Sequence, residues 1–204
     1  MIPESVIGRA ACLLALVVAA VLLASCGGGG SSGAGGGGMM PSPLQATFTS
    51  GGPGDITLEP GVSSGADFDV EVRVNGPFND FFGAAFRIEL PAMIVLIAGS
   101  NGNGSFLLDG SPDTTFNAIQ EGDEVLVVAT RVQGAGKSYV PGVDVVGSRL
   151  LMTLKFRAAG PTAGALAIKD FPSREVRTCD DATETCEPEP DGNIVWSGGS
   201  VVAQ

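Results

Sequence analysis

The stretch that decides the fold is Asp67-Phe68-Asp69-Val70-Glu71-Val72-Arg73-Val74-Asn75. Apolar side chains alternate with charged or polar ones at every step. One face carries Phe68 and three valines, and the other carries the polar groups. A period of two is the spacing of side chains on one face of a β-strand. The stretch therefore predicts a strand with one buried and one solvated face.

The same alternation recurs in residues 82–90 and 151–157, and shorter apolar runs predict further strands. Turn-forming sequences such as Asn-Gly-Pro and Asp-Gly separate these runs, and no stretch keeps a 3.6-residue period long enough to predict a helix. The pattern indicates an all-β fold, an antiparallel β-sandwich or barrel with Greek-key-like connections. The shorter strands are expected at residues 56–58, 94–97, 106–108, 115–119, 125–132, 166–168 and 194–196.

Composition excludes several functions. The 204 residues include 11 Lys and Arg against 22 Asp and Glu, a net charge of -11, and no histidine. Nucleic-acid binding needs cations that displace counterions from phosphate, so no nucleic-acid partner is expected. The absence of histidine removes Ser-His-Asp and Cys-His nucleophiles and histidine metal ligands. We expect a binding protein rather than an enzyme.

Residues 1–26 have the features of a bacterial lipoprotein signal peptide. An apolar run from residue 10 follows Arg9 and ends in Leu23-Ala24-Ser25-Cys26, which resembles a lipobox. Its 16 positions give about 24 Å of helix, short of the ~30 Å hydrocarbon core of a bilayer. Lipidation of Cys26 would make the protein an exported, membrane-anchored lipoprotein. The glycine after Cys26 is compatible with the outer membrane, on a side that the sequence leaves open, and secretion or a retained anchor is the alternative.

Residues 27–54 contain 12 of the 31 glycines. Such a composition buries too little apolar surface to offset the entropy of ordering, so the segment is expected to be a disordered tether. A domain of 150 residues, 55–204, then follows, which is long enough to bury a proper core.

Several short sequences in this domain resemble, in order, a cohesin module. Cohesins are the β-sandwich receptor domains of cellulosome scaffolds and of related non-cellulosomal surface proteins, and they belong to the same structural superfamily as carbohydrate-binding modules. The matching sequences are Gly83-Ala84-Ala85-Phe86-Arg87-Ile88-Glu89-Leu90-Pro91-Ala92-Met93-Ile94, Gly104-Ser105-Phe106-Leu107, Thr114-Thr115-Phe116-Asn117-Ala118, Val127-Val128-Ala129-Thr130-Arg131, Leu151-Met152-Thr153-Leu154-Lys155-Phe156-Arg157-Ala158 and Gly198-Gly199-Ser200-Val201-Val202.

The resemblance implies a nine-stranded jelly-roll sandwich. It also implies that one sheet, made of the third, fifth, sixth and eighth strands, docks a dockerin, a small calcium-loaded helical module. These strands are expected near residues 82–90, 105–109, 114–120 and 149–157. The side chains on the partner-binding face are then Ala85, Arg87, Glu89, Asn117, Leu151, Thr153, Lys155 and Arg157, with ordinary solvated strand residues as the alternative interpretation.

The chain departs from the cohesin pattern in two places. Leu90 stands where an acidic residue usually precedes the proline, and residues 171–190 carry an insertion with two cysteines. Cys179 and Cys186 are expected to form a structural disulfide, because export to an oxidising compartment favours pairing. Acidic neighbours on both sides of the pair disfavour a redox role.

No cofactor or resident metal is expected, although one acidic run leaves calcium open. Residues 180–193 hold six carboxylates in 14 positions, but they lack the order of an EF-hand loop, so an acidic surface hairpin is favoured. Asp109, Asp113, Glu121 and Asp123 lie in turns, and turn residues on a sandwich seldom form a glycosidase pair.

Polysaccharide binding is the alternative function. Sugars stack on exposed flat aromatic rings, and the candidates are Trp196 and Tyr139, with Phe78, Phe81 and Phe82 near a loop. The partner is therefore expected to be a protein of the dockerin type or a polysaccharide.

Overall fold

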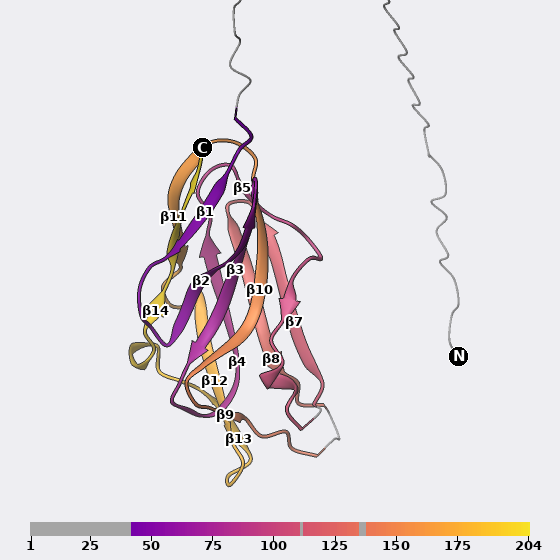
Figure 1. Ribbon diagram of the computed structural model, residues 1–204. Helices are drawn as coiled ribbons and strands as arrows, with labels where there is room; N and C mark the ends of the chain where they lie inside the picture. The colour runs from indigo at the N-terminus through magenta and orange to yellow at the C-terminus, as the bar shows by residue number, and fades with distance from the viewer. Residues whose placement is uncertain (1–41, 111, 135–137) are drawn as a thin grey trace, which may run out of the picture. The chain divides into compact units, whose positions relative to one another are not determined.

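The computed structural model describes residues 42–110, 112–134 and 138–204 (Figure 1). Pro41–Gln204 is one compact unit. The predicted signal peptide, the lipidation site at Cys26 and residues 27–41 of the predicted tether lie outside the described residues.

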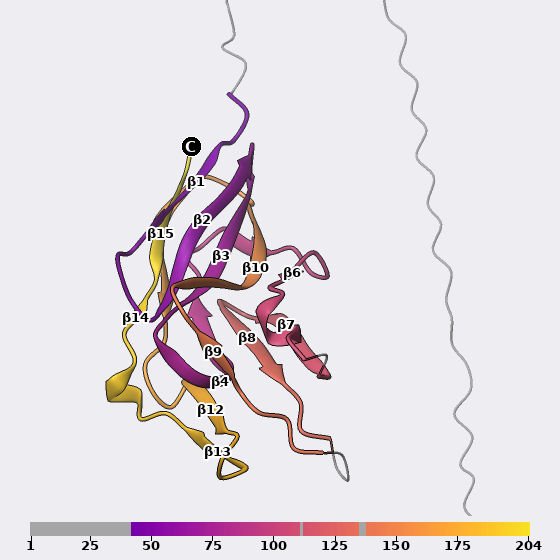
Figure 2. The same ribbon diagram turned by 60° about the horizontal axis from the view of Figure 1, so that its bottom comes forward.

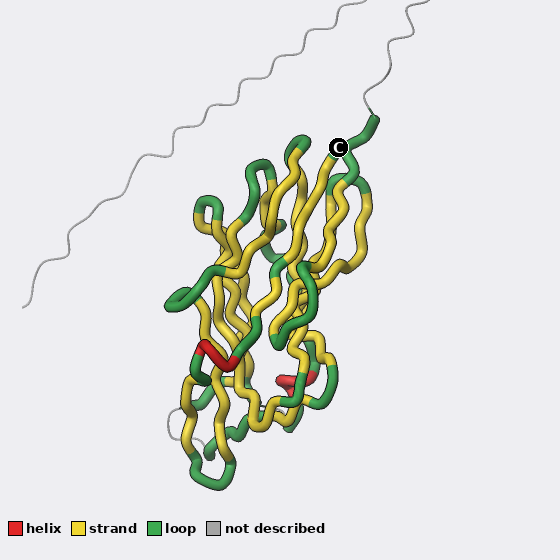
Figure 3. The backbone as a smooth tube through the Cα atoms, turned by 90° about the vertical axis from the view of Figure 1, so that its left-hand side faces the viewer, coloured by secondary structure: helices red, strands yellow, loops and turns green. Residues whose placement is uncertain are grey.

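Two sheets form the fold, and the predicted antiparallel, all-β sandwich is confirmed. Nine strands belong to one sheet: β1 (Ala46–Ser50), β4 (Phe78–Glu89), β7 (Thr114–Glu121), β8 (Glu124–Arg131), β9 (Val143–Val145), β11 (Thr162–Ile168), β12 (Arg174–Asp180), β13 (Thr185–Pro188) and β15 (Gly199–Ala203). Six belong to the other: β2 (Ile56–Ser64), β3 (Asp67–Asn75), β5 (Ile94–Leu96), β6 (Gly102–Asn103), β10 (Ser148–Ala158) and β14 (Trp196–Ser197). Figure 3 shows how little of the described chain is helical, with two 3-10 turns, η1 (Phe106–Leu108) and η2 (Asp191–Asn193).

The alternating stretch that predicts the fold forms β3, in the middle of the six-stranded sheet. Phe68, Val70, Val72 and Val74 have no exposed surface, while the residues between them are partly exposed. β2 and β10 pair antiparallel with its two edges. The strand therefore buries one face against the opposite sheet, as its period of two predicts.

The core fills the space between the two sheets. Phe68 stacks between Phe48 of β1 and Phe156 of β10, with ring centroids 6.4 and 5.6 Å apart. Because β1 belongs to the nine-stranded sheet, this aromatic stack joins both layers.

β4 is the central strand of the nine-stranded sheet. β8 and β9 pair with successive parts of one edge, and β11 and β12 pair with successive parts of the other. The continuous part of the sheet beside β4 therefore has the order β7, β8, β4, β12 and β13, which can be followed in Figure 2.

The domain begins earlier than the sequence predicts. Residues 46–50, which the sequence predicts to belong to the tether, form β1 and pair with β15 over its whole length. Ala46 and Phe48 are buried, and Gln45 exchanges two backbone hydrogen bonds with Gln204. The predicted boundary at residue 55 is therefore wrong, because two buried side chains suffice to fix a short strand in a glycine-rich region.

Other local predictions also change. Residues 106–108, predicted as a strand, form η1, in which Leu107 is buried and Leu108 is exposed. The strand predicted at 194–196 is β14, which pairs parallel with β2 at Trp196 and Ser197. β9, β12 and β13 are strands that the apolar pattern did not predict. Across the described part of the chain, no helix has the length and apolar character needed to cross a membrane.

Candidate docking face

The outer face of the nine-stranded sheet carries a row of small and apolar side chains. Val128 of β8 lies directly opposite Ala85 of β4 on one side and Asn117 of β7 on the other. The next row places Leu126 between Arg87 and Ile119. Ile119 is 46% exposed. A rigid sheet therefore presents an apolar centre to solvent, as the core of a protein interface does.

A shallow hollow marks one end of this centre. Gly83 lies opposite Thr130, and a side-chain carbon on Gly83 would come within 2.5 Å of the Thr130 side chain. The Thr130 side chain therefore occupies the place that a Gly83 side chain would take, and a hollow of about 150 Å³ lies beside it, between Gly83, Ala85, Val128 and Thr130. Glu175 and Arg177 of β12 line its other wall and bond to each other at 2.5 Å.

Charged side chains cluster at the opposite end of the face. The Arg87 guanidinium contacts Glu121 at 3.0 Å and Glu124 at 3.3 Å, and the Lys169 ammonium contacts Glu124 at 2.6 Å. The hydrogen bond from Lys169 lowers the pKa of Glu124 below its ordinary value, and the hydrogen bond to Glu121 raises the pKa of Arg87. Both charge states are therefore maintained across the neutral range.

The outer face of the six-stranded sheet has a different character. Its charges pair across neighbouring strands: Lys155 with Asp69 at 3.5 Å, and Arg157 with Asp67 at 2.6 Å. The hydrogen bond from Arg157 lowers the pKa of Asp67. Cross-strand ion pairs of this kind form a solvated surface over the middle strands β3 and β10, and the exposed apolar residues of this sheet, Val62 and Val95, belong to the neighbouring strands β2 and β5.

The eight residues predicted for one partner-binding face lie on both faces of the molecule. Ala85, Arg87, Glu89 and Asn117 belong to β4 and β7. Thr153, Lys155 and Arg157 belong to β10, which lies in the other sheet, so the prediction that all eight share a face is wrong. The fourth strand of the candidate face is β12, which the cysteine-containing insertion supplies.

The prediction that Leu151 lies on the outer face is also wrong, because Leu151 is buried and faces the core. The register of β10 against β3 shifts between Leu150 and Met152, so Leu151 is an additional residue in the ladder. Both Leu151 and Met152 therefore point inward. A strict period of two cannot reveal such a bulge.

Sequence reasoning missed Leu126 and Val128 as face residues, although it placed them in a strand. The sequence contained a signal for this placement: residues 125–129 are apolar on both faces of the strand, which indicates that neither face is simply solvated. We define the docking face by the residues that share this surface: Gly83, Ala85, Arg87, Glu89, Asn117, Ile119, Leu126, Val128, Thr130, Glu175 and Arg177.

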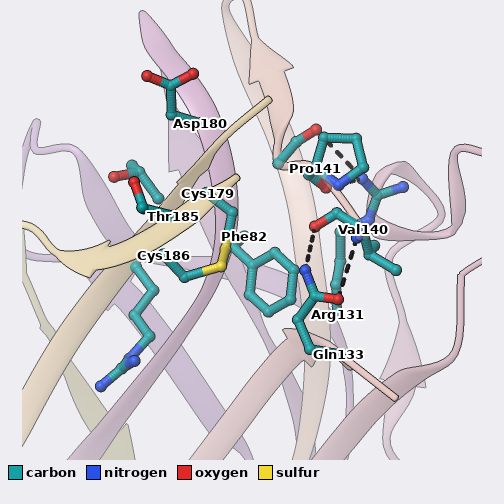
Figure 4. Close-up of a disulfide and its surroundings, with 12 residues drawn as sticks. Phe82, Arg131, Gln133, Val140, Pro141, Cys179, Asp180, Thr185 and Cys186 are labelled. Atoms are coloured by element: carbon teal, nitrogen blue, oxygen red, sulfur yellow. Dashed lines mark hydrogen bonds between the residues drawn. A yellow bond between two sulfur atoms is a disulfide. The ribbon is translucent and has the colours of Figure 1, made fainter. Parts of the chain in front are cut away.

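The predicted disulfide is present. Cys179 and Cys186 are opposite each other in β12 and β13, and their sulfur atoms are bonded beside the ring of Phe82 (Figure 4). The Tyr139 hydroxyl donates to the carbonyls of Asp180 and Thr185, at 2.9 and 3.3 Å. The bridged hairpin therefore binds the Tyr139 hydroxyl. In Figure 1 this hairpin, β12 and β13, lies at the end of the sandwich remote from the C-terminus.

An open cleft of about 1040 Å³ lies beside this hairpin, with Tyr139 and several carboxylates in its wall. Burial raises the pKa of Asp80, and the charges of Asp144, Asp180 and Asp181 raise it further. Among the residues that the structure describes, no three acidic or cysteine side chains are arranged to hold a metal ion. The acidic run begins at the last residue of β12 and continues through the turn of the predicted surface hairpin, β13 and η2.

Arg131 fixes the loops that border this cleft. Its buried guanidinium donates to the carbonyls of Leu107 at 3.1 Å and Pro141 at 2.5 Å, and also to those of Gly142 and Asp109. Burial lowers the pKa of Arg131. Four carbonyls from two loops converge on one cation, so the residue has a structural position rather than a ligand-binding one.

Trp196 is not an open platform for sugar. The Arg174 guanidinium lies over its ring, 5.5 Å from the centroid, and the ring of Phe86 packs 5.6 Å away. Asp191 and Asp170 bind that guanidinium at 2.7 and 3.0 Å. The Asp191 hydrogen bond raises the pKa of Arg174, so the cation stays in place over the ring.

No protein-family model matches the chain. No curated protein matches it either. Among solved structures, the chain is similar to the non-cellulosomal cohesin from the hyperthermophilic archaeon Archaeoglobus fulgidus, with 17% sequence identity and a TM-score of 0.42. The match covers 76% of this chain and 88% of that chain.

Proposed function

We propose that this protein is a non-catalytic binding module that recognises a protein partner through the docking face. The observation that carries the proposal is the contrast between the two outer faces. One has an apolar centre bordered by charged residues, and the other has cross-strand ion pairs. Protein–protein interfaces commonly have the first arrangement, because a desolvated apolar centre contributes affinity and a charged rim fixes the orientation of the partner.

The partner class that we propose is dockerin-like. A small helical module can lay an apolar ridge along Leu126, Val128 and Ala85, and its charged ends can meet the Arg87 cluster and the Glu175–Arg177 pair. The hollow at Gly83 has room for an apolar side chain of the partner.

We also propose that lipidation of Cys26 anchors the module to the outer membrane. The Leu-Ala-Ser-Cys sequence after an apolar run supports this proposal. Metabolic labelling with a radioactive fatty acid should label the full chain and leave Cys26→Ala unlabelled. Labelling of Cys26→Ala would contradict the proposed anchor.

The docking proposal is tested by capture of proteins from the source cell's extract. The oxidised full chain is immobilised, and captured proteins are identified in calcium and again after chelation. Two variants alter the docking face, Arg87→Glu and Val128→Asp. Two matched controls alter the opposite outer face, Lys155→Glu and Thr153→Asp.

We expect one set of proteins to be captured by the wild type and by both controls, and to be lost from both docking-face variants. Melting temperatures of all four variants should remain close to that of the wild type, because each changed side chain lies on an outer face of the sandwich and not in the core. Equal capture by all five proteins would overturn the proposal that the docking face binds the partner. Release by chelator would assign a calcium-loaded dockerin-like partner, since folding of that module depends on calcium.

Polysaccharide binding is the second candidate function, favoured by the position of Tyr139 in the wall of the open cleft. Retardation of the wild type by a polysaccharide gel, without protein capture, would support it. Tyr139→Ala should then migrate as in a gel without polysaccharide.

A further inference from the structure

A five-residue excursion interrupts the sheet at Arg87. β11 and β12 pair with β4 on either side of this residue, so residues 169–173 stand opposite Arg87 alone. The Arg87 amide donates to the Ser173 carbonyl at 3.0 Å, and the Lys169 amide donates to the Arg87 carbonyl at 2.9 Å. Both ends of the excursion are therefore bonded to the central strand.

The excursion is also fixed by its own contacts. The Ser173 amide donates to the Asp170 carbonyl at 3.0 Å, which closes a tight turn. The Asp170 carboxylate contacts Arg174 at 3.0 Å, and the Lys169 ammonium contacts Glu124 at 2.6 Å. The turn thus holds a fixed conformation with Phe171 at its tip.

Phe171 is 71% exposed at that tip. Exposed phenylalanine on an ordered turn has the properties of an interface anchor, because it offers a large apolar area that loses little conformational entropy on binding. Beside it lies a hollow of about 250 Å³ between Pro172, Leu126, Ala85 and Arg87. A projecting aromatic ring and a hollow bordered by apolar groups are therefore neighbours on one patch.

We propose that a second copy of this chain binds to this patch, with each Phe171 entering the hollow beside Pro172 of the other copy. A two-fold interface uses the same surface on both subunits, so each copy must carry both halves of the contact. The patch meets this requirement, because the ring and the hollow belong to adjacent residues.

The charges of the patch are also compatible with binding a second copy of the chain. Charged groups of both signs border the patch and pair within the chain, Arg87 and Lys169 with Glu124 and Arg174 with Asp170. A patch with both signs can meet its own copy without opposing like charges throughout. The net charge of -11 repels the copies at long range, and salt screens this repulsion.

The contact covers Leu126 and Arg87, so self-association and the proposed partner docking would compete for the docking face. The two proposals fail separately, since self-association is measured with the purified chain alone and docking is measured by capture of other proteins.

The test is sedimentation of the oxidised full chain in 0.15 M salt, at protein concentrations up to about 1 mM. We expect a reversible monomer–dimer equilibrium whose dissociation constant rises about tenfold or more in Phe171→Ala. Val146→Ala is the matched control, because Val146 is also an exposed apolar residue, 78% exposed, on a turn away from the patch. Its dissociation constant should equal that of the wild type.

A mixing experiment identifies the reciprocal contact. Phe171→Ala keeps the hollow, and Leu126→Glu keeps the ring, so an equimolar mixture restores one of the two ring–hollow contacts. The mixture should dimerise more strongly than either variant alone. A wild-type chain that remains monomeric throughout this range would overturn the proposal. A dimer that Phe171→Ala leaves unchanged, or a mixture no stronger than its components, would overturn it equally.

Discussion

Arg87 and Lys155 lie on the outer faces of opposite sheets, with the core of the sandwich between them. Arg87 contacts two glutamates at one end of an apolar row, whereas Lys155 contacts Asp69 within a ladder of ion pairs. The buried neighbours of both residues, Ile88 and Phe156, point the other way into the core. Either outer surface can therefore be changed without altering the other, and only one has an apolar centre.

Arg131→Met should destabilise the domain strongly. Methionine keeps an apolar stem but removes every donor, so the carbonyls of Leu107, Pro141, Gly142 and Asp109 lose their shared partner. Leaving one buried and three partly buried carbonyls without this donor should lower the free energy of unfolding by about 3 kcal/mol. Urea denaturation of the wild type and the variant measures this difference.

The matched control is Arg149→Met, which removes an exposed arginine on β10. Its free energy of unfolding should stay within about 0.5 kcal/mol of the wild type. Equal losses in the two variants would mean that the guanidinium network of Arg131 has no special role.

Replacing both cysteines, Cys179→Ala with Cys186→Ala, should lower the free energy of unfolding by about 2.5 kcal/mol, because the bridge closes a loop of about eight residues. Denaturation is measured with and without reductant. Reductant should bring the wild type to the stability of the double variant and leave the variant unchanged. A wild type that is insensitive to reductant after verified reduction would refute this role of the disulfide.

Asp80→Asn should stabilise the protein at neutral pH. The folded-state pKa of Asp80 is raised by burial and by nearby carboxylates, so its favourable contribution exists at low pH and is lost as pH rises through that pKa. Asparagine removes the charge and tolerates the positive φ of 54° at this position. We expect the melting temperature to rise by about 2 °C at pH 7, with the gain vanishing in acid.

Asp67→Asn should change the stability in the opposite direction, lowering it at neutral pH. The Arg157 hydrogen bond lowers the pKa of Asp67, so this carboxylate stabilises the fold above its ordinary pKa and the contribution is lost as pH falls through the folded-state value. The variant should therefore melt below the wild type at pH 7 and approach it in acid. Parallel pH dependence in the two variants would contradict the assignment of the shifts.

The sequence predicted the parts of the fold that follow strict alternation. β3 and β4 were predictable because an apolar residue at every second position is buried, as Val70, Val72 and Phe86 are. β12 could not be predicted from its sequence, because Val176 is its one buried apolar residue besides Cys179 and its other residues are polar. Its pairing with β4 and the disulfide, rather than its own pattern, define that strand.

The candidate site was predictable in part for the same reason. Arg87 and Ala85 were placed correctly on the outer face of β4, because their neighbours are buried in alternation. Which strands lie beside β4 depends on the path of the chain between sheets, and local periodicity carries no information about that path. Lys155 was therefore assigned to the wrong sheet although its outward orientation was right.

Arg174→Ala should uncover the ring of Trp196. The guanidinium lies over the indole and is held there by Asp191 and Asp170, so alanine removes the cover while leaving Phe86 in contact. The chain has one tryptophan, so its fluorescence reports on this site alone. Quenching by acrylamide should increase in the variant. Arg177→Ala is the control, because Arg177 belongs to the same strand but pairs with Glu175 on the docking face. Equal quenching in the wild type and Arg174→Ala would show that the ring of Trp196 is already open to solvent. Trp196 would then remain a candidate for binding sugar.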